Sequence, residues 1–220
     1  QVATQEAPPR RLVSPRGRKR WLLGCYCCRS ETLERISHYT VAYTDHFVYL
    51  RTMSIRKLTS ADAVAFRELR VEMCSAHPEA FGQTPEEVRD MANDKFLDWM
   101  SPSESYPEKY VLGYFDSDLL VGTVAFKRED MFKERHRGWI WSVYVRPEAR
   151  GRGISKLLMQ RVIDDSRRID GLELLILVVA LTQTGARTLY TSLGFFTTGL
   201  ILQGYKLANG RYVDEEEMML

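Results

Sequence analysis

Residues 143–155 read Val-Tyr-Val-Arg-Pro-Glu-Ala-Arg-Gly-Arg-Gly-Ile-Ser. The β-branched and aromatic start of this stretch predicts a strand, and its glycines predict a turn in which the backbone can approach a ligand closely. The apolar spacing from Ile154 onward predicts a helix that begins directly after the turn. Because the first turn of a helix has free amides and carries the positive end of the helix dipole, we expect an anion cradle here, suited to a pyrophosphate.

Two common phosphate-binding motifs do not fit this stretch. A dinucleotide-binding fingerprint would need a third glycine where Lys156 stands, and a Walker loop would need a Gly-Lys pair, which occurs nowhere in the chain. A bare Gly-x-Gly is a weak signal. The order of strand, Val-x-Pro, Arg-Gly-x-Gly-Ile and amphipathic helix is a much more specific one.

The segments on either side predict alternating strands and helices. Thr84, Pro85 and Glu87 form a capping box with proline at the first helical position. The order β-α-α-β-β-β-α-β-α-β-β predicts a mixed α/β fold whose sheet carries helices on both faces. We expect strands at 55–58, 110–115, 119–127, 139–145, 172–181, 196–206 and 212–220, and helices at 60–77, 85–100, 154–169 and 184–193.

Composition limits the class of protein. The chain has 220 residues, of which 45% are hydrophobic and 27% charged, so a fully disordered or collagen-like chain is excluded. The longest apolar run, 174–181, is far shorter than the roughly 20 residues that a membrane-spanning helix needs. Four cysteines are too few for a disulfide scaffold at this length. We therefore expect one compact domain with a tail, in a reducing, cytoplasmic setting.

The tail is residues 1–52, which carry a net charge of +5 and three early prolines. We expect a basic, disordered N-terminal extension, and we interpret Met53, where regular patterning begins, as the natural start. The residues before it would then be translated upstream sequence or sequence added for expression. An export signal is rejected because its apolar stretch is too short, and a metal clip at Cys25, Cys27 and Cys28 is rejected because no second ligand pair stands at zinc spacing.

Residues 53–220 resemble the GNAT superfamily of N-acetyltransferases. The run Arg150-x-x-Gly153-x-Ser155 is similar to the acyl-coenzyme A loop of that family, with Ser155 where glycine or alanine is usual. A second match, to another cofactor motif of the family, is Gln183-x-x-Ala186-x-x-Leu189-Tyr190-x-x-x-Gly194-Phe195, with glutamine where asparagine is usual. The resemblance implies a twisted, mostly antiparallel central sheet and acetyl-CoA as co-substrate, with no metal.

The resemblance also implies roles for individual residues. Main-chain groups of Val143 and Val145 would contact the pantetheine arm and the acetyl oxygen. Tyr190 would act near the sulfur as a general acid or hydrogen-bond donor, and Gln183 would lie beside the cofactor. The general base stays unassigned, and we interpret Glu173 as a solvated strand start. The pyrophosphate would be bound by Arg150, Gly151, Arg152, Gly153, Ile154, Ser155 and Lys156.

Other features have two readings. Trp139, Trp141 and Tyr144 fit a core strand better than an acceptor pocket, although they could form one. The loop at 78–83 lies where the family admits its acceptor, and the acidic run at 214–217 fits a solvated edge strand.

The functional prediction is an enzyme that transfers acetyl from acetyl-CoA to a primary amine of a small molecule or peptide, by direct attack in a ternary complex. The alternative is a non-catalytic acyl-CoA sensor or pseudoenzyme. A third hypothesis, nucleic-acid binding through residues 10–20, is not favoured, and no membrane partner is expected. A homodimer is predicted from the habits of the superfamily.

Overall fold

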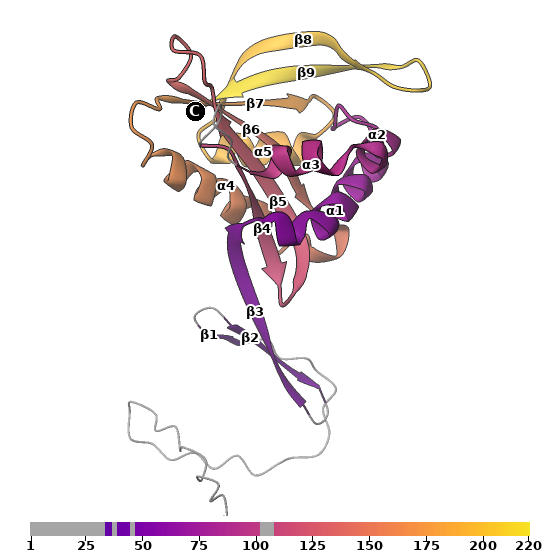
Figure 1. Ribbon diagram of the computed structural model, residues 1–220, viewed down its shortest axis with the longest axis vertical. Coiled ribbons are helices and arrows are strands. Elements are labelled where there is room, and N and C mark those ends of the chain that lie inside the picture. Colours follow the sequence, from indigo (N-terminus) through magenta and orange to yellow (C-terminus); the bar gives the residue numbers. More distant parts are fainter. Residues whose placement is uncertain (1–33, 37–38, 45–46, 102–107) are drawn as a thin grey trace, which may run out of the picture.

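A sheet of nine strands organises the described part of the protein (Figure 1). The computed structural model describes residues 34–36, 39–44, 47–101 and 108–220. The strands are β1 (Glu34–Ile36), β2 (Tyr39–Thr44), β3 (Phe47–Lys57), β4 (Tyr110–Asp116), β5 (Leu119–Arg128), β6 (Arg137–Val145), β7 (Leu174–Ala180), β8 (Phe196–Lys206) and β9 (Tyr212–Met219). The helices are α1 (Ala63–Ala76), α2 (Pro85–Asp90), α3 (Asn93–Met100), α4 (Ile154–Ser166) and α5 (Thr184–Ser192), with short 3-10 turns at Ser60–Asp62 and Pro147–Ala149.

The strands lie in the order β1-β2-β3-β4-β5-β6-β7-β9-β8. Strands β6 and β7 are parallel, and all the other neighbouring strands are antiparallel. The β6–β7 pairing covers only three positions, from Arg137↔Leu174 to Trp139↔Ile176. Beyond Trp139 the two strands part, and the middle of the sheet opens toward their C-terminal ends. The predicted mixed, mostly antiparallel sheet is confirmed.

Each face of the sheet has its own core. Side chains alternate between the faces along a strand, so Tyr110 and Leu112 of β4 pack on one side and Val111 on the other. The first core includes Leu158 and Met159 of α4 and also Tyr190 of α5. The second is formed with α1, α2 and α3. Helices therefore cover both faces, as predicted.

The capping box predicted at Thr84 is present. The Thr84 hydroxyl accepts from the Glu87 amide at 3.2 Å, and the Glu87 carboxylate accepts from the Thr84 amide at 2.7 Å. One helix over 85–100 was predicted, but the structure has two, because the backbone is extended at Met91. Arg67 of α1 donates to the carbonyls of Val88 and Met91, at 2.7 and 2.9 Å, and so compensates the carbonyls freed at this break.

Strands also form before Met53. We expected no regular structure in residues 1–52, but β1, β2 and the first part of β3 depart from that expectation. Sequences such as Tyr-Thr-Val-Ala-Tyr-Thr in β2 are rich in β-branched and aromatic residues, which favour strands. Figure 1 shows β1 and β2 extending away from the remaining sheet along β3. Pairing of β3 with β4 begins at Met53↔Asp116. The clustered cysteines at 25–28 and the basic residues at 10–20 lie outside the described residues.

The acidic run at 214–217 was expected on a solvated edge strand, and this expectation is wrong. Strand β9 lies between β7 and β8, so it has no free edge along this run. Glu215 and Glu216 are buried, and Glu216 forms an ion pair with Arg187 of α5 and accepts a hydrogen bond from Thr197. A buried carboxylate needs such partners.

Asp62 gives a prediction about acid stability. Its carboxylate accepts from both Arg56 terminal nitrogens at 2.7 Å and from the Thr59 amide at 2.8 Å, and the Arg56 hydrogen bond lowers its pKa to about 2. A lowered pKa stabilises the fold above the ordinary carboxyl pKa near 4, and this stabilisation is lost as the pH falls toward 2. We expect Asp62→Asn to reduce the free energy of unfolding by about 1 kcal/mol at pH 7, since solvent weakens the pair. In urea titrations the difference should disappear near pH 2, and a constant difference from pH 7 to 2 would contradict the prediction.

Candidate active site

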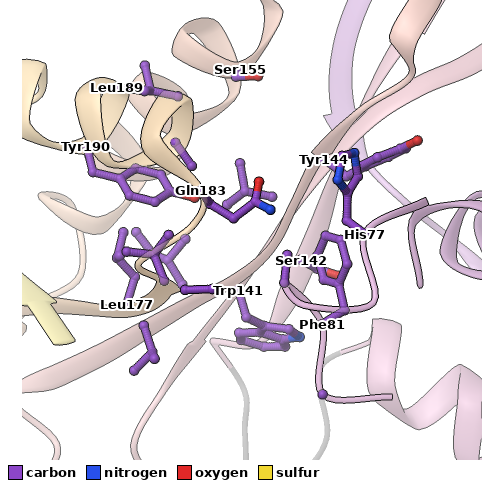
Figure 2. Close-up of a pocket in the computed structure, with 18 of the residues that line it drawn as sticks. His77, Phe81, Trp141, Ser142, Tyr144, Ser155, Leu177, Gln183, Leu189 and Tyr190 are labelled. Carbon is purple, nitrogen blue, oxygen red and sulfur yellow. The ribbon is translucent and has the colours of Figure 1, made fainter. Parts of the chain in front are cut away.

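A cavity of about 590 Å³ lies where β6 and β7 part. Helix α5 and the start of α4 border it on one side, and α1 with the loop at 77–83 borders it on the other. Figure 2 shows Gln183 and Tyr190 facing His77, Phe81 and Trp141 across this opening. Its lining includes six residues predicted from the sequence, namely Val143, Val145, Arg150, Ser155, Gln183 and Tyr190.

Strand β6 carries a bulge beside the cavity. Its register with β5 shifts between Thr123 and Ala125, and Ser142 has a φ of +60°, which is unusual for a residue with a side chain. The Ser142 carbonyl accepts from the Thr123 hydroxyl at 3.1 Å, which fixes the bulge. Since β6 has no described strand partner on the β7 side after Trp139, the main chain of Val143 faces the cavity edge without a ladder on that side. The Val145 carbonyl accepts from Arg150 Nε at 3.0 Å.

The turn before α4 is an open cradle of amides. Gly151 and Gly153 have φ values of +74° and +75°, and a Cβ added at either would meet nothing within 4 Å. After Arg150, the next main-chain amide that donates to another described residue is that of Leu157, which donates to the Gly153 carbonyl at 3.1 Å. The amides from 151 to 156 therefore have no acceptor among the described residues, which is compatible with the predicted anion cradle.

The predicted residues of this turn differ in where their side chains lie. Ile154 is buried in the core against the sheet, so its side chain is structural and only its amide faces the cradle. Lys156 is exposed. Arg152 points elsewhere, because it forms an ion pair with Asp116 of β4 at 2.8 Å and contacts the Met53 sulfur at 3.7 Å. Its guanidinium therefore does not add charge to the cradle in this arrangement.

This placement of Arg152 leads to a prediction. We expect Arg152→Met to lower the free energy of unfolding by about 1 to 2 kcal/mol, because the nearly buried Asp116 loses its cation. Coenzyme A affinity should stay within about threefold, since the Arg152 guanidinium is engaged by Asp116 and not by the ligand. Lys156→Met is the matched control and should show the reverse, with unchanged stability and about threefold to tenfold weaker binding. Calorimetry and urea titration of both variants measure this, and a tenfold loss of affinity in Arg152→Met would contradict it.

Tyr190 lies on the inner face of α5. It is 6% exposed, packs against Phe195 with ring centroids 6.1 Å apart, and lines the cavity. Burial raises the pKa of its phenol above the ordinary value of 10. The hydroxyl therefore keeps its proton at neutral pH and can donate it to a basic or anionic group in the cavity.

Gln183 joins the two sides of the opening. Its amide nitrogen donates to the Glu79 carboxylate at 2.7 Å, across from the N-terminus of α5 to the loop after α1. Position 183 has glutamine where the family usually has asparagine, and the Gln183 side chain contacts the side chain of Glu79. Glu79 also lies 3.7 Å from Nδ1 of His77.

His77 is held by Arg150, with 3.0 Å between His77 Nε2 and Arg150 Nη2. Because a guanidinium only donates, Nε2 is the acceptor in this pair and its lone pair is occupied. Tyr144 lies beside them and donates to Glu72 at 3.0 Å, and burial together with this hydrogen bond raises the pKa of Tyr144 to about 12. Sequence reasoning did not single out His77.

Arg70 of α1 is a second cavity residue that the sequence analysis missed. It is 3% exposed, donates to the Ser142 hydroxyl and to Gln83 Oε1, the latter at 2.8 Å, and lies 4.0 Å above the Trp99 ring. Burial lowers the pKa of this arginine to about 10. The sequence could have indicated its burial, because position 70 lies at helical spacing from Phe66 and Met73 on the apolar face of α1.

The aromatic residues of β6 border the cavity after all. Trp139, Trp141 and Tyr144 all line it, although the sequence favoured a core role, and Tyr144 serves both because it is also buried in the second core. Phe81 and Gln83 of the loop predicted to admit the acceptor line it as well. Glu173 is exposed at the start of β7, as predicted. No cluster of three metal-ligating side chains occurs among the described residues.

Residues 66–195 match the profile of the acetyltransferase (GNAT) family. This chain belongs to that family. The GNAT match contains the β6 bulge, the amide cradle and α5, so it spans every element that borders the cavity except β8.

Individual GNAT proteins are similar to this chain. It is 27% identical, over 67% of its length and 88% of the relative, to an L-methionine sulfoximine/L-methionine sulfone acetyltransferase of Salmonella typhimurium. It is 32% identical, over 39% of its length and 49% of the relative, to a spermidine N(1)-acetyltransferase of Vibrio cholerae. A Salmonella typhimurium structure described as an acetyltransferase with its cofactor acetyl-CoA superposes with a TM-score of 0.63 at 25% identity, covering 77% of this chain and 93% of that one.

None of the helices in the described part of this GNAT protein is long and apolar enough to cross a membrane.

Proposed function

We propose that this GNAT protein transfers an acetyl group from acetyl-CoA to a primary amine of a small molecule or peptide, by direct attack of the amine in a ternary complex. The observation that carries the proposal is the row of free amides from 151 to 156 at the mouth of a cavity between two parted strands. This combination suits a long ligand with an anionic end and a reactive end. Family membership supplies the reaction class.

The residues present fit acetyl-CoA. Open space at Gly151 and Gly153 leaves room for a diphosphate against the amides, and a side chain at either position would fill it. The main chain of Val143 faces the side of β6 that lacks a strand partner and would bind the pantetheine arm and the acetyl oxygen. When bound, acetyl-CoA supplies an acetyl group on a thioester. Arg150 and the exposed Lys156 add positive charge at this end of the cavity.

Tyr190 would donate its proton to the leaving sulfur. A general acid must still hold its proton at the working pH, and burial of the phenol ensures this. Water is the proposed acceptor of the amine proton. The described lining of the cavity contains no carboxylate, and the lone pair of His77 is occupied by Arg150. A relay of the proton through water to main-chain carbonyls fits these groups best.

Two measurements on the full chain test the proposal. Calorimetry with coenzyme A and acetyl-CoA should show binding, and thiol release should rise when amines from different classes are added, with the acetylated product seen by mass spectrometry. Reactions without amine give the hydrolytic background. No binding of coenzyme A would contradict the proposal.

The same experiment separates the enzyme from the alternative of an acyl-CoA sensor. Binding of acetyl-CoA without thiol release on any amine would favour the sensor. The sensor alternative is supported by Gln183, which stands where asparagine is usual in the family and whose side chain contacts Glu79.

The organisation of the chain is part of the proposal. The proposed GNAT domain spans residues 53–220, and the start of the β3–β4 pairing at Met53 supports this boundary. Exposed Phe196, Leu200 and Leu202 on β8 support a homodimer, which sedimentation analysis tests. A cytoplasmic location follows from the cysteine content. Neither a membrane nor a nucleic acid is proposed as a partner.

A further inference from the structure

The cavity contains a buried cation with spare hydrogen-bonding capacity. Arg70 is 3% exposed, and none of the ion pairs among the described residues includes it. Its Nε is buried and has no hydrogen-bond partner among the described residues, while the two terminal nitrogens each make one contact, to Ser142 and Gln83. A guanidinium has five N–H donors, so Arg70 can donate hydrogen bonds to a further ligand.

A buried and unpaired charge is costly, so its retention calls for an explanation. Stacking on Trp99 at 4.0 Å compensates part of the cost, and two neutral acceptors compensate another part. Full compensation needs an anion, and arginine matches the two oxygens of a carboxylate in geometry. Arg70 borders the cavity, so an anionic ligand group can reach it from there.

The charge of the whole lining agrees with this. The ionisable side chains lining the described cavity, apart from tyrosine, are Arg70, Arg150 and His77, with no aspartate or glutamate. A polyamine acceptor would meet no carboxylate in this lining, and Glu79 and Glu72 behind it are already bonded to Gln183 and Tyr144. An acceptor that carries a negative group is therefore favoured.

We propose that Arg70 binds the carboxylate of the amine acceptor, which makes the acceptor an amino acid or a closely related amino-carboxylate. Arg70 donates to Ser142, the residue directly before Val143, so the bound carboxylate lies close to the edge of β6 where the amine must react. The amine and carboxylate of the acceptor are then separated by few bonds. Phe81, Trp99 and Trp141 form walls for an apolar side chain. This inference rests on the proposed acetyltransferase function.

Paired acceptors test the proposal in the wild-type protein. Each L-amino acid of a panel is compared with its amide and with the amine that lacks the carboxyl carbon, for example phenylalanine, phenylalaninamide and 2-phenylethylamine. The rates are corrected for the fraction of unprotonated amine. We expect kcat/KM to be at least about tenfold higher for the acids, since a hydrogen-bonded charged pair is gained. Thiol release that is equal or faster with the amides would overturn the inference and leave the proposed function intact.

Variants then connect this preference to Arg70. Arg70→Met should lower kcat/KM for the acids by about 10- to 100-fold and leave the amides within about threefold, so that the preference disappears. Arg70→Lys keeps a charge without the planar fork and should keep part of the preference. Arg67→Met is the matched control, because Arg67 lies one turn away on α1 and stacks on Phe96 at 4.2 Å, outside the cavity. It should change stability but not the ratio of acid to amide.

A third measurement uses a carboxylate without an amine. 3-Phenylpropionate should compete with the acceptor in the wild-type protein and lose at least about tenfold in affinity in Arg70→Met. A merely structural role of Arg70 would not produce this loss. An unchanged inhibition constant overturns the inference, and absence of thiol release with every acid and every amide contradicts the proposed function itself.

Discussion

Replacing Gly153 with aspartate is expected to weaken coenzyme A binding by about 100-fold or more. The substitution places a carboxylate in the open space beside the free amides, where it competes for them and repels the diphosphate. About 100-fold corresponds to roughly 2.7 kcal/mol, which is in the range of one lost charge-assisted hydrogen bond. Calorimetry with coenzyme A measures the effect.

The chain offers a matched control for this substitution. Gly210, in the turn between β8 and β9, has a φ of +82°, and a Cβ added there would also meet nothing within 4 Å. Gly210→Asp should therefore cause a similar loss of stability, about 1 kcal/mol, because both positions are left-handed. It should not change coenzyme A affinity. Equal affinity in the two variants would show that the turn before α4 does not bind the diphosphate.

Tyr190→Phe is expected to lower kcat by about 100-fold and to leave the dissociation constant of coenzyme A nearly unchanged. The variant keeps the ring that packs on Phe195 but removes the proton that the leaving sulfur would take. General acid catalysis accounts for factors of about 10² to 10⁴. Single-turnover rates with a saturating amine separate this chemical effect from binding.

The control for this variant is Tyr110→Phe. Tyr110 is also a buried tyrosine with a raised pKa, but it lies in the core of β4 and its hydroxyl makes no hydrogen bond with another described residue. Its kcat should equal that of the wild type. A kcat that is unchanged in Tyr190→Phe as well would exclude the phenol as the acid.

Local chemistry accounts for the parts of the structure that were predicted well. The strand, glycine turn and helix at 143–155 follow from residue preferences over a short distance, and so does the capping box at Thr84. The predicted ends of β8 agree with the observed ones, and those of β9 and α5 agree within one residue. Position 190 was identified through a motif, since a buried tyrosine on a short helix carries no signal of its own.

Long-range contacts account for the errors. The acidic run on β9 looks solvent-exposed as sequence, and only the pairing of β9 with both β7 and β8 buries it. Glu216 is compensated by Arg187, which lies in a different element. Similarly, the break between α2 and α3 is held by Arg67 of α1, more than 20 residues away. No window of neighbouring residues contains these partners.

Arg70 is a case in which the pattern itself was informative. A charged residue on the apolar face of a helix, in line with Phe66 and Met73, conflicts with the expected periodicity. Such conflicts concentrate at functional sites, because a fold tolerates them only where another benefit follows. The sequence could have marked Arg70 as a cavity residue on this ground, although not its contacts with Ser142 and Gln83.

The position of β9 between β7 and β8 also affects how the protein is made. Strand β7 is joined to β6 at only three positions, so its main attachment is to β9. On the ribosome, β3 to β6 and α1 to α4 emerge first and can pack while synthesis continues. The side of the cleft formed by β7 can be held in place only after residues 212–219, which form β9, have left the exit tunnel. We therefore expect a chain stopped before Tyr212 to contain the whole GNAT match at 66–195 but to lack the strand that holds β7 in place, and so to lose the proposed binding of coenzyme A.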